Sequence, residues 1–476
     1  MTTRREFFRK SALAGAGLVF AGASSKVNAA SYQRIVGANR RINIAHVGIG
    51  NRGWEIIRDF DRTNMVNVTA LCDVDLGGPN TGQAVAAHPE ARTFKDFREM
   101  FDKASHEFEA VTINTPDFSH FPVTMRSIAS GKHVFVEKPL ARTFLEVDLM
   151  EKIAKKYPNV VTAMCNQGHS GDNYHQFRAW KEAGLIKDIY AVTAHMNNAR
   201  RWHPWDPSIH RFPRETPTPE TLDWDAWLSQ SFWHDFAEGY YHQGQWRGWY
   251  SFGMGALGDW GAHLIDTVHR FLELGMPYEV DPTHITYHND YFFPMCSTIE
   301  FKFPARGNMP PLDLTWYDGV HNIPMVPEGF GDVPVDPNIP TVAGQPFQPT
   351  RLAPGKILYG RDITFRGGSH ASALQIIPAE RARAMEAAGQ VPDFPRDQSN
   401  HFENFCLAIN GQEESRSNFE VAGPLSKVFC LGVVTQRLNR KIRFDRQTNQ
   451  IINDPIANAL LVGPPPRKGW EDYYVV

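Results

Sequence analysis

Residues 41–53 read "RINIAHVGIGNRG", and this stretch decides the fold class of the N-terminal half. Its first half alternates as a β-strand does, and the residues that follow, "RGWEIIRDF", have helical periodicity. Gly48, Gly50 and Gly53 lie between the two with the spacing G-x-G-x-x-G. In such a turn the first glycine permits the tight bend, the second lets the backbone approach a pyrophosphate, and the third allows close helix packing. The stretch therefore predicts a dinucleotide-binding strand, turn and helix.

A carboxylate follows the next strand-like run, "VNVTALCDVD". Asp73 lies at the end of that run, twenty-five residues after Gly48. A carboxylate in this position accepts hydrogen bonds from the adenosine ribose and repels a 2′-phosphate. The sequence therefore predicts NAD rather than NADP as the cofactor, and Asn51 and Arg52 at the start of the helix complete this part of the cofactor site.

Strand-like and helix-like runs continue to alternate as far as Cys165. The strand-like runs are "FEAVTINTP", "HVFVEKP" and "NVVTAMCNQ", and the helix-like runs include "HFPVTMRSIASG" and "FLEVDLMEKIAKKY". Such alternation indicates βα units on a parallel sheet. We therefore expect an α/β protein whose residues 41–165 form a Rossmann domain with a doubly wound parallel sheet.

The remainder, residues 166–476, is expected to form a second α/β domain for substrate binding and oligomerisation. It opens with a helix-like "DNYHQFRAWKEAGL" and a strand-like "KDIYAVTAHMN", and it closes with the helical patterns "SNHFENFCLAING" and "EVAGPLSKVFCLGVVTQRLNR". Residues 304–354 carry eleven prolines, which is too many for a central strand or a helix interior. We expect that range to be a long excursion or a lid.

The first thirty residues resemble a targeting segment. Arg4 and Arg5 precede an apolar run, residues 12–23, that is too short to span a bilayer. The arginine pair is similar to the twin-arginine export signal. We therefore expect residues 1–30 to direct folded export to the periplasm through the twin-arginine machinery, with residues 31–40 as an arm or linker and no stable membrane insertion of the mature form. An ordinary signal peptide or a retained membrane anchor is the alternative.

Composition narrows the class of protein. At 476 residues and 42% hydrophobic content, the chain is long enough for two globular cores. Its formal net charge of −3 gives no reason to expect a nucleic-acid partner or an anionic membrane surface. The five cysteines show no C-x-x-C spacing and the histidines no H-E-x-x-H spacing, so we expect neither a disulfide framework nor a metal site.

Residues 133–141, "HVFVEKPLA", raise a question about Lys138. The run alternates like a buried strand until it reaches Glu137, Lys138 and Pro139. Burying an unpaired ammonium costs several kcal/mol. The plain interpretation is a lysine that extends to solvent from a strand end. The alternative is a functional lysine, because a doubly wound sheet binds its ligand at the carboxyl ends of its strands.

The order of several motifs is similar to that of a known family. "VGIGNRG", "CDVD", "TPDFSH", "VEKPLA" and "GDWGAHLID" together resemble the Gfo/Idh/MocA family, which includes glucose-fructose oxidoreductase and inositol dehydrogenase. The resemblance covers nearly the whole chain after residue 30. It implies a Rossmann domain followed by an α/β domain with a large, open, predominantly antiparallel sheet, and a homo-oligomer such as a dimer or tetramer.

The resemblance also implies a catalytic set. Lys138 in "EKP" would point at the nicotinamide and the substrate hydroxyl, and Glu137 would hold the ammonium or contact the cofactor. Asp259 and His263, spaced i, i+4, would form the acid/base pair, in which the histidine exchanges the proton of the alcohol and the aspartate orients it. Without the family, such a pair is more often a structural contact within one helix.

Further residues are assigned by the resemblance to the surroundings of the cofactor. Thr115, Pro116 and His120 lie in the turn after the third strand-like run, which borders the cofactor. "CNQGHSG" departs from the pattern of many relatives. Gln167 and His169 in this stretch are therefore assigned to the nicotinamide or the sugar on a looser match.

Two aromatic clusters, "RRWHPWDP" and "GQWRGWY", indicate a sugar site. Aromatic faces stack on the apolar side of a pyranose, and Arg or His donates to its hydroxyls. The alternative is that these aromatics belong to an oligomer interface or to the core of a loop. The candidate substrate-binding residues here are Trp202, His203, Trp246, Arg247 and Tyr250.

Together these patterns predict an exported NAD-dependent oxidoreductase that acts on a hydroxyl of a sugar, polyol or glycoside and keeps its cofactor tightly bound. A glycosidase or lyase that uses bound NAD to oxidise the sugar transiently is the alternative, and the sequence separates the two poorly because the first step is shared. A sugar-binding protein that retains nucleotide without turnover is disfavoured by Lys138 and the Asp259/His263 pair.

Overall fold

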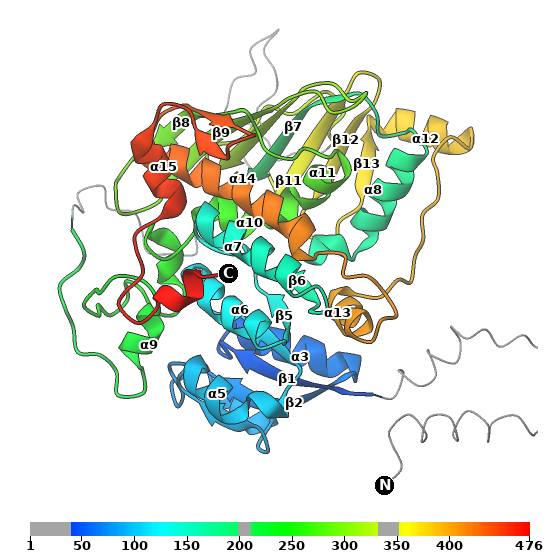
Figure 1. The fold of residues 1–476 in the computed structure, drawn as a ribbon. Helices are drawn as coiled ribbons and strands as arrows, with labels where there is room; N and C mark the ends of the chain where they lie inside the picture. The colour runs from blue at the N-terminus through cyan, green and yellow to red at the C-terminus, as the bar shows by residue number, and fades with distance from the viewer. Residues whose placement is uncertain (1–39, 199–210, 332–351) are drawn as a thin grey trace, which may run out of the picture. The chain divides into compact units, whose positions relative to one another are not determined.

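The glycine-rich turn follows a strand of a six-stranded parallel sheet. The structure is a computed structural model that describes residues 40–198, 211–331 and 352–476 (Figure 1). The strands run in the order β3-β2-β1-β4-β5-β6, and all neighbours are parallel. They are β1 (Ile42–Val47), β2 (Val66–Cys72), β3 (Arg92–Phe94), β4 (Ala110–Ile113), β5 (His133–Val136) and β6 (Thr162–Met164).

Helices connect these strands. They are α3 (Arg52–Thr63), α4 (Gly82–Ala87), α5 (Phe97–Ala104), α6 (His120–Ala129) and α7 (Phe144–Lys156), with short 3₁₀ turns η1 (Ser105–Glu107) and η2 (Asp117–Ser119). Because β1 pairs with both β2 and β4, the strand order reverses there, and the carboxyl ends of these strands form the ligand-binding edge of a doubly wound sheet. The predicted Rossmann architecture is confirmed. Strand β3 was not predicted because its sequence, Arg-Thr-Phe, contains a single apolar residue and so forms no apolar run.

A nine-stranded sheet forms the second part of the fold, in the order β13-β12-β11-β7-β10-β9-β8-β14-β15. Strands β7 and β10 run parallel, and the remaining neighbours run antiparallel. The predicted predominantly antiparallel sheet is confirmed. Its strands are β7 (Ile189–Met196), β8 (Glu279–Thr286), β9 (Cys296–Phe303), β10 (Leu312–Asp318), β11 (Gly355–Gly360), β12 (Thr364–Gly368), β13 (Leu374–Ile377), β14 (Ile442–Asp445) and β15 (Gln450–Ile451).

Strand β10 corrects the prediction for residues 304–354. We expected no central strand in that range because of its prolines, yet β10 lies between β7 and β9 in the middle of the nine-stranded sheet. The prolines flank the strand: Pro310 and Pro311 precede it and Pro324 follows, so every residue of β10 keeps its N–H for the sheet. Residues 332–351, which hold further prolines of this range, lie outside the described residues.

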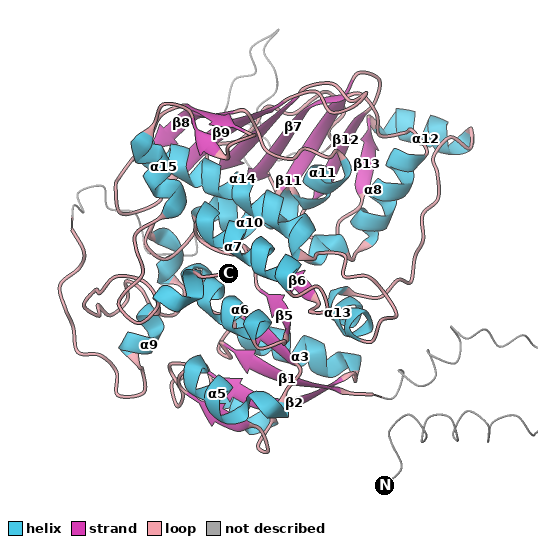
Figure 2. Cartoon of the chain, in the orientation of Figure 1, coloured by secondary structure: helices cyan, strands magenta, loops and turns pink. Residues whose placement is uncertain are grey.

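The helices of the second part are α8 (Asp172–Glu182), α9 (Trp224–Leu228), α10 (Gly255–Leu264), α11 (Asp266–Phe271), α12 (Ala379–Ala387), α13 (His401–Ile409), α14 (Phe419–Leu438) and α15 (Pro455–Val462), with 3₁₀ turns η3 (Gln167–His169), η4 (Gln245–Gly248) and η5 (Glu471–Tyr474). Helices α8, α10 and α14 pack against the nine-stranded sheet, whereas α13 contacts α3 of the Rossmann part (Figure 2). No helix in the described part of the chain is long and apolar enough to cross a membrane.

Helix α14 joins the two sheets. It contacts α7 of the Rossmann part and β8 and β9 of the nine-stranded sheet. Lys427 on α14 forms ion pairs with Asp148 and Glu151 on α7, at 2.9 and 2.6 Å. One apolar cluster contains residues from both sheets, for example Val136 and Phe301. Residues Arg41–Val476 therefore form one compact unit, and the domain boundary at residue 165 stays a prediction.

Gly53 shows why the third glycine of the turn is required. A Cβ at this position would lie 2.0 Å from the backbone oxygen of Gly48, closer than any real Cβ contact. The missing side chain therefore lets α3 start directly against the turn that leaves β1. Gly48 has a φ of +80°, which side chains other than glycine rarely adopt.

Replacing Gly53 with alanine is expected to destabilise the fold by about 3 kcal/mol or more, because the backbone of the turn must move to admit the methyl group. Gly82→Ala is the matched control, since a Cβ there meets nothing within 4 Å, and its effect should stay below about 1 kcal/mol. Urea-induced unfolding of the two variants measures the difference. Equal stability of both variants would contradict this explanation of the turn.

Candidate functional site

A cavity of about 870 Å³ lies at the carboxyl edge of the Rossmann sheet. Its walls include the residues that follow β1, β2, β4 and β5, which is where a doubly wound sheet binds a nucleotide. The same cavity is lined by residues of α10 and η4 from the second part of the chain. The cofactor side and the predicted acid/base side of the site therefore share one space.

The glycine turn fits a dinucleotide. Gly50 lines the cavity, and a Cβ at this position would already lie 3.3 Å from the Cβ of Asn80. Asn51 has a positive φ and precedes the first residue of α3, so the helix N-terminus opens at the cavity. A helix N-terminus offers backbone N–H groups and a partial positive charge, both of which suit a pyrophosphate. These residues would hold the pyrophosphate of a bound NAD.

Asp73 is oriented by two backbone donors. Its Oδ2 accepts from the N–H of Ile49 at 2.8 Å, and its Oδ1 accepts from the N–H of Asp75 at 3.0 Å. Burial raises the pKa of Asp73, and these two N–H groups oppose the shift. Each carboxylate oxygen has a second lone pair, so the fixed carboxylate is suited to accept hydrogen bonds from a ribose.

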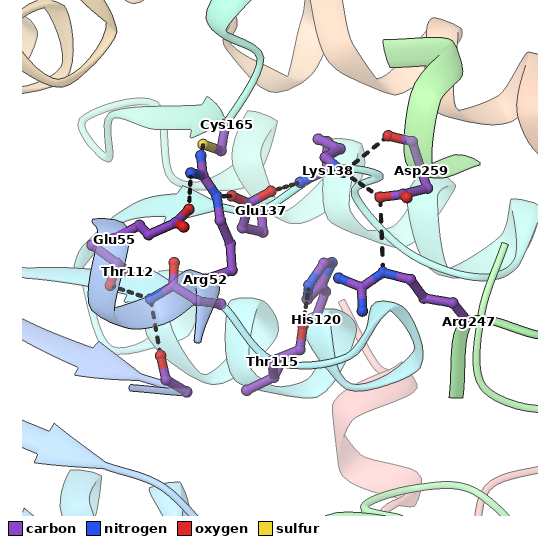
Figure 3. A network of polar contacts seen from close by, with 12 residues as sticks. Arg52, Glu55, Thr112, Thr115, His120, Glu137, Lys138, Cys165, Arg247 and Asp259 are labelled. Carbon is purple, nitrogen blue, oxygen red and sulfur yellow. Dashed lines mark hydrogen bonds and ion pairs between the residues drawn. The ribbon is translucent and has the colours of Figure 1, made fainter. Parts of the chain in front are cut away.

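Lys138 reaches across the cavity wall from β5 to α10 (Figure 3). Its Nζ lies 2.7 Å from Oδ1 of Asp259 and 2.9 Å from the backbone oxygen of the same residue. The side chains are only 12% and 7% exposed, so this ion pair is largely shielded from water. Arg247 approaches the same carboxylate oxygen at 3.8 Å. Lys138 is therefore a paired lysine in the cavity wall and does not extend to bulk solvent.

Glu137 belongs to a different ion pair from Lys138. Its Oε1 accepts from Nε of Arg52 at 2.8 Å, and its Oε2 accepts from the backbone N–H of Lys138 at 3.0 Å. Burial disfavours the charged carboxylate, but Arg52 and Lys138 outweigh burial and lower the pKa of Glu137. The guanidinium of Arg52 also donates to Glu55 at 2.8 Å. Arg52 thus ties the start of α3 to the end of β5, as Figure 3 shows.

His263 lies one helical turn after Asp259 on α10, and both line the cavity. The ring stacks on His370 with a centroid distance of 4.0 Å and an interplanar angle of 18°. Burial, followed by the nearby charge of Lys138, holds the pKa of His263 well below its usual value. The imidazole is therefore neutral near pH 7. Its Nδ1 has no hydrogen-bond partner among the described residues.

His120 connects two strand ends. Its ring nitrogens lie 2.8 Å from the backbone oxygens of Thr115 and Pro139, which belong to the turns after β4 and β5. Burial lowers the pKa of His120, and the two carbonyl oxygens oppose the shift. Thr115, Pro116 and His120 all line the cavity. The two contacts of His120 therefore hold the turn after β4 and the turn after β5 in a fixed relative position.

Asp117 is a site residue that the sequence analysis did not single out. It lines the cavity, is only 6% exposed, and accepts a hydrogen bond from the N–H of Met254 at 3.0 Å. Burial raises the pKa of Asp117 to about 7, with Asp259 acting in the same direction and Arg247 and Lys138 against it. Asp117 is the aspartate of the quoted motif "TPDFSH", so the sequence did mark its position. Nothing in the local sequence predicts how deeply this carboxyl is buried.

The remaining predicted residues divide into three groups. Gln167, Trp246 and Arg247 line the cavity, and the Arg247 guanidinium lies 4.2 Å from the centre of the Trp246 ring. His169 and Tyr250 are buried outside the cavity lining: His169 lies 3.4 Å from Asp266, and Tyr250 packs on Phe293. The predictions for Trp202 and His203 lie outside the described residues.

No group of three or more His, Cys, Asp or Glu side chains in the described ranges is arranged to hold a metal ion. The five cysteines are all free thiols, and four of them are buried.

Two models of one family match the chain. The model for the oxidoreductase family's NAD-binding Rossmann fold matches residues 42–164, and the model for the family's C-terminal alpha/beta domain matches residues 182–296. This chain belongs to the Gfo/Idh/MocA family of oxidoreductases, and its Rossmann part is an NAD-binding domain.

Curated relatives match over part of their length. A "Glycosyl hydrolase family 109 protein" from Saccharopolyspora erythraea is 34% identical over 215 residues, which cover 42% of this chain and 46% of the relative. An "Alpha-N-acetylgalactosaminidase" from Shewanella oneidensis is 28% identical over 174 residues, which cover 32% of this chain and 38% of the relative. The chain thus spans less than half the length of these curated relatives.

Solved structures show the same fold at low identity. The WlbA dehydrogenase from Bordetella pertussis, solved in complex with NADH and UDP-GlcNAcA, is 15% identical with a TM-score of 0.55, over 85% of this chain and 99% of that chain. The aldose-aldose oxidoreductase from Caulobacter crescentus, complexed with glycerol, is 14% identical with a TM-score of 0.54, over 85% of this chain and 100% of that chain.

We expect Asp73→Asn to reduce the preference for NAD over NADP by about tenfold or more, because the neutral amide no longer repels a 2′-phosphate. Isothermal titration with each nucleotide, after any bound nucleotide has been removed and the protein refolded, measures the ratio of the two affinities. No separate control is needed, because a general loss of binding lowers the affinities for NAD and NADP together and leaves their ratio unchanged. Equal affinity of the unaltered protein for NAD and NADP would contradict the role of Asp73.

Asp117→Asn is expected to stabilise the protein at high pH relative to the unaltered chain. Since the pKa of Asp117 rises from 3.8 to about 7 on folding, the native carboxyl holds a proton that the unfolded one has lost. The native state therefore loses stability as the pH rises through this window, by up to about 4 kcal/mol. Asparagine does not titrate and can still accept from Met254.

Urea-induced unfolding of both proteins from about pH 5 to about pH 9 measures this effect. The stability difference between Asp117→Asn and the unaltered chain should grow with pH and level off above about pH 8. A difference that is constant over the range would show that the carboxyl titrates normally.

Proposed function

We propose that this protein oxidises a hydroxyl-bearing carbon of a sugar, polyol or glycoside, with NAD as a resident cofactor that stays bound between turnovers and is regenerated when a second, carbonyl-bearing substrate takes up the hydride. The observation that carries the proposal is the pairing of Lys138 with Asp259 in the wall of a cavity that also contains the glycine turn and His263. An alcohol dehydrogenation needs a hydride acceptor, a group that takes up the hydroxyl proton and a cation near the oxygen.

When bound, NAD supplies the hydride acceptor at its nicotinamide ring. Lys138 follows β5 at the same sheet edge as the turn after β1, so its ammonium is suited to donate a hydrogen bond to the substrate oxygen. That donor stabilises the negative charge that develops as the hydroxyl proton leaves. Asp259 fixes the ammonium from the other side, through both its carboxylate and its backbone oxygen.

His263 is the proposed proton acceptor. A neutral imidazole can take a proton, and burial together with Lys138 keeps this one neutral. The carboxylate of Asp259 lies one helical turn away and stabilises the imidazolium once it forms. His370 holds the ring plane by stacking. Trp246 and Arg247 are the proposed contacts to the sugar, since both line the same cavity.

A second candidate is an NAD-dependent glycosidase, and the curated relatives favour it. Matches include glycosyl hydrolase family 109 proteins and one alpha-N-acetylgalactosaminidase. In that reaction the same residues would oxidise the sugar, and the hydride would return after the glycosidic bond breaks. A panel of free sugars and their glycosides, followed by mass analysis of products, separates the two: net oxidation supports the dehydrogenase, and released aglycone without net redox change supports the glycosidase.

We also propose that the chain is exported in its folded state with NAD bound and acts as a homo-oligomer. The support for export is the sequence of residues 1–30, with Arg4 and Arg5, all of which lie outside the described residues. The support for a homo-oligomer is the membership of the family. Replacing both arginines with lysine should leave the protein in the cytoplasm, as cell fractionation measures. Unchanged export of that variant would contradict the twin-arginine route.

Lys138→Met should lower the rate of hydride transfer at least about a hundredfold, because it removes the proposed donor to the substrate oxygen. The NAD content should remain near that of the unaltered protein, since Lys138 is not proposed to hold the pyrophosphate. Formation of NADH by absorbance and bound NAD by extraction measure the two effects.

Lys427→Met is the matched control. Lys427 is likewise a shielded lysine, with Asp148 and Glu151 as its ion partners, but it lies on α14 and does not line the cavity. Its replacement should lower stability while activity per folded molecule stays unchanged. Full activity of Lys138→Met, or an equal loss of activity in Lys138→Met and Lys427→Met, would show that Lys138 has only a structural role.

A further inference from the structure

Residues 221–247, which include α9 and most of η4, extend from the second part of the chain to the loop after β2. We name this segment the strap. The N–H of Asp223 donates to the backbone oxygen of Val74 at 2.8 Å, and Nζ of Lys95 donates to the backbone oxygen of Thr221 at 2.8 Å. The strap is therefore attached to the same loop that carries the proposed ribose carboxylate, Asp73.

Asp75 binds the strap through both carboxylate oxygens. Oγ1 of Thr221 donates to its Oδ1 at 2.6 Å, and Nε2 of His242 lies 3.0 Å from its Oδ2. The carboxylate is only 6% exposed, so these contacts are protected from water. The backbone N–H of Asp75 donates in turn to Oδ1 of Asp73. One loop thus connects the contacts of the strap to the carboxylate expected to bind the ribose.

The strap is a well-packed segment. Trp224 and Trp227 are buried, and the Trp227 ring packs on Phe118 of the Rossmann part with a centroid distance of 5.2 Å. Arg467, close to the C-terminus, donates to the backbone oxygen of Ser229 at 2.6 and 2.9 Å. A segment held on both sides in this way keeps a defined position over its neighbours.

The strap also forms part of the cavity wall. Ala226, Trp227, Ser229 and the stretch 242–244 line the same cavity as Asp73, Asp75 and Lys95. The Rossmann loops alone would leave a nucleotide exposed along its length, as an open sheet edge does. Here the second part of the chain supplies a further wall at the end of the cavity marked by Asp73.

We propose that the strap retains the dinucleotide: it closes the adenosine end of the site, and the contacts of Asp75 with Thr221 and His242 hold it closed. NAD then leaves only when these contacts break. This inference rests on the proposed function, in which NAD stays bound between turnovers. It assigns the retention to Asp75, Thr221 and His242, which are not members of the proposed catalytic set.

The test is the rate at which bound NAD exchanges. The holoenzyme is loaded with isotopically labelled NAD, mixed with excess unlabelled NAD, and sampled over time by rapid gel filtration and mass analysis. The double variant Thr221→Val, His242→Ala removes both partners of Asp75 and should exchange at least about tenfold faster than the unaltered protein, as each decade corresponds to the loss of about one hydrogen bond. Each single variant should lie between the two.

The control removes the same two side-chain types elsewhere. Thr283 and His288 are exposed residues in and after β8, far from the cavity lining. The double variant Thr283→Val, His288→Ala should exchange NAD at the unaltered rate. Thermal unfolding of both doubles separates a general loss of stability from an opened site. Unchanged exchange in Thr221→Val, His242→Ala would overturn the proposal.

Hydrogen exchange on the unaltered protein gives a second measurement that needs no variant. Backbone amides of residues 221–247 should exchange more slowly with NAD bound than without it. Equal protection in both states would overturn the role of the strap while leaving NAD-dependent activity in place. Rapid NAD exchange in the unaltered protein would instead contradict the retention in the proposed function, and with it this inference.

Discussion

The ion pair between Lys138 and Asp259 is the contact on which the site depends. Its two residues lie 121 positions apart, at the end of β5 and within α10, so it forms only when the Rossmann part and the second part are packed together. An ammonium and a carboxylate that are both shielded from water stabilise each other only with good geometry, and removing either partner leaves the other charge buried. The proposed catalytic arrangement and the packing of the two halves are therefore coupled.

The surroundings of this pair have a consistent electrostatic pattern. Arg52 and Glu137 form a second pair beside it, and Arg247 adds a further cation near Asp259. Among these charges, His263 is kept neutral and Asp117 is held close to its midpoint near neutral pH. A site with fixed cations, one neutral imidazole and one carboxyl near its midpoint can move a proton without a large change in net charge.

Local patterns predicted much of the site. The glycine turn, the strand that ends at Asp73 and the family's motif order were sufficient to identify residues that the fold gathers around one cavity. Contacts between distant segments were not predictable. The i, i+4 spacing suggests that Asp259 serves His263, whereas the ion partners that the structure shows for its carboxylate are Lys138 and Arg247. The burial of Asp117 and the pairing of Asp75 with Thr221 depend on the same long-range packing. Strand β10 was not predicted because the prolines on both sides of it dominate the composition of residues 304–354.

Helix α14 has a consequence for motion. Because one helix contacts both α7 and the nine-stranded sheet, and is anchored to α7 by two ion pairs, the two halves are not free to rotate about a flexible linker. Many two-domain enzymes admit their substrates by opening such a hinge. In this protein, the packed core fixes the distance between the nucleotide edge and His263, the proposed proton acceptor. A substrate must therefore reach the buried charges by movement of the segments that border the cavity.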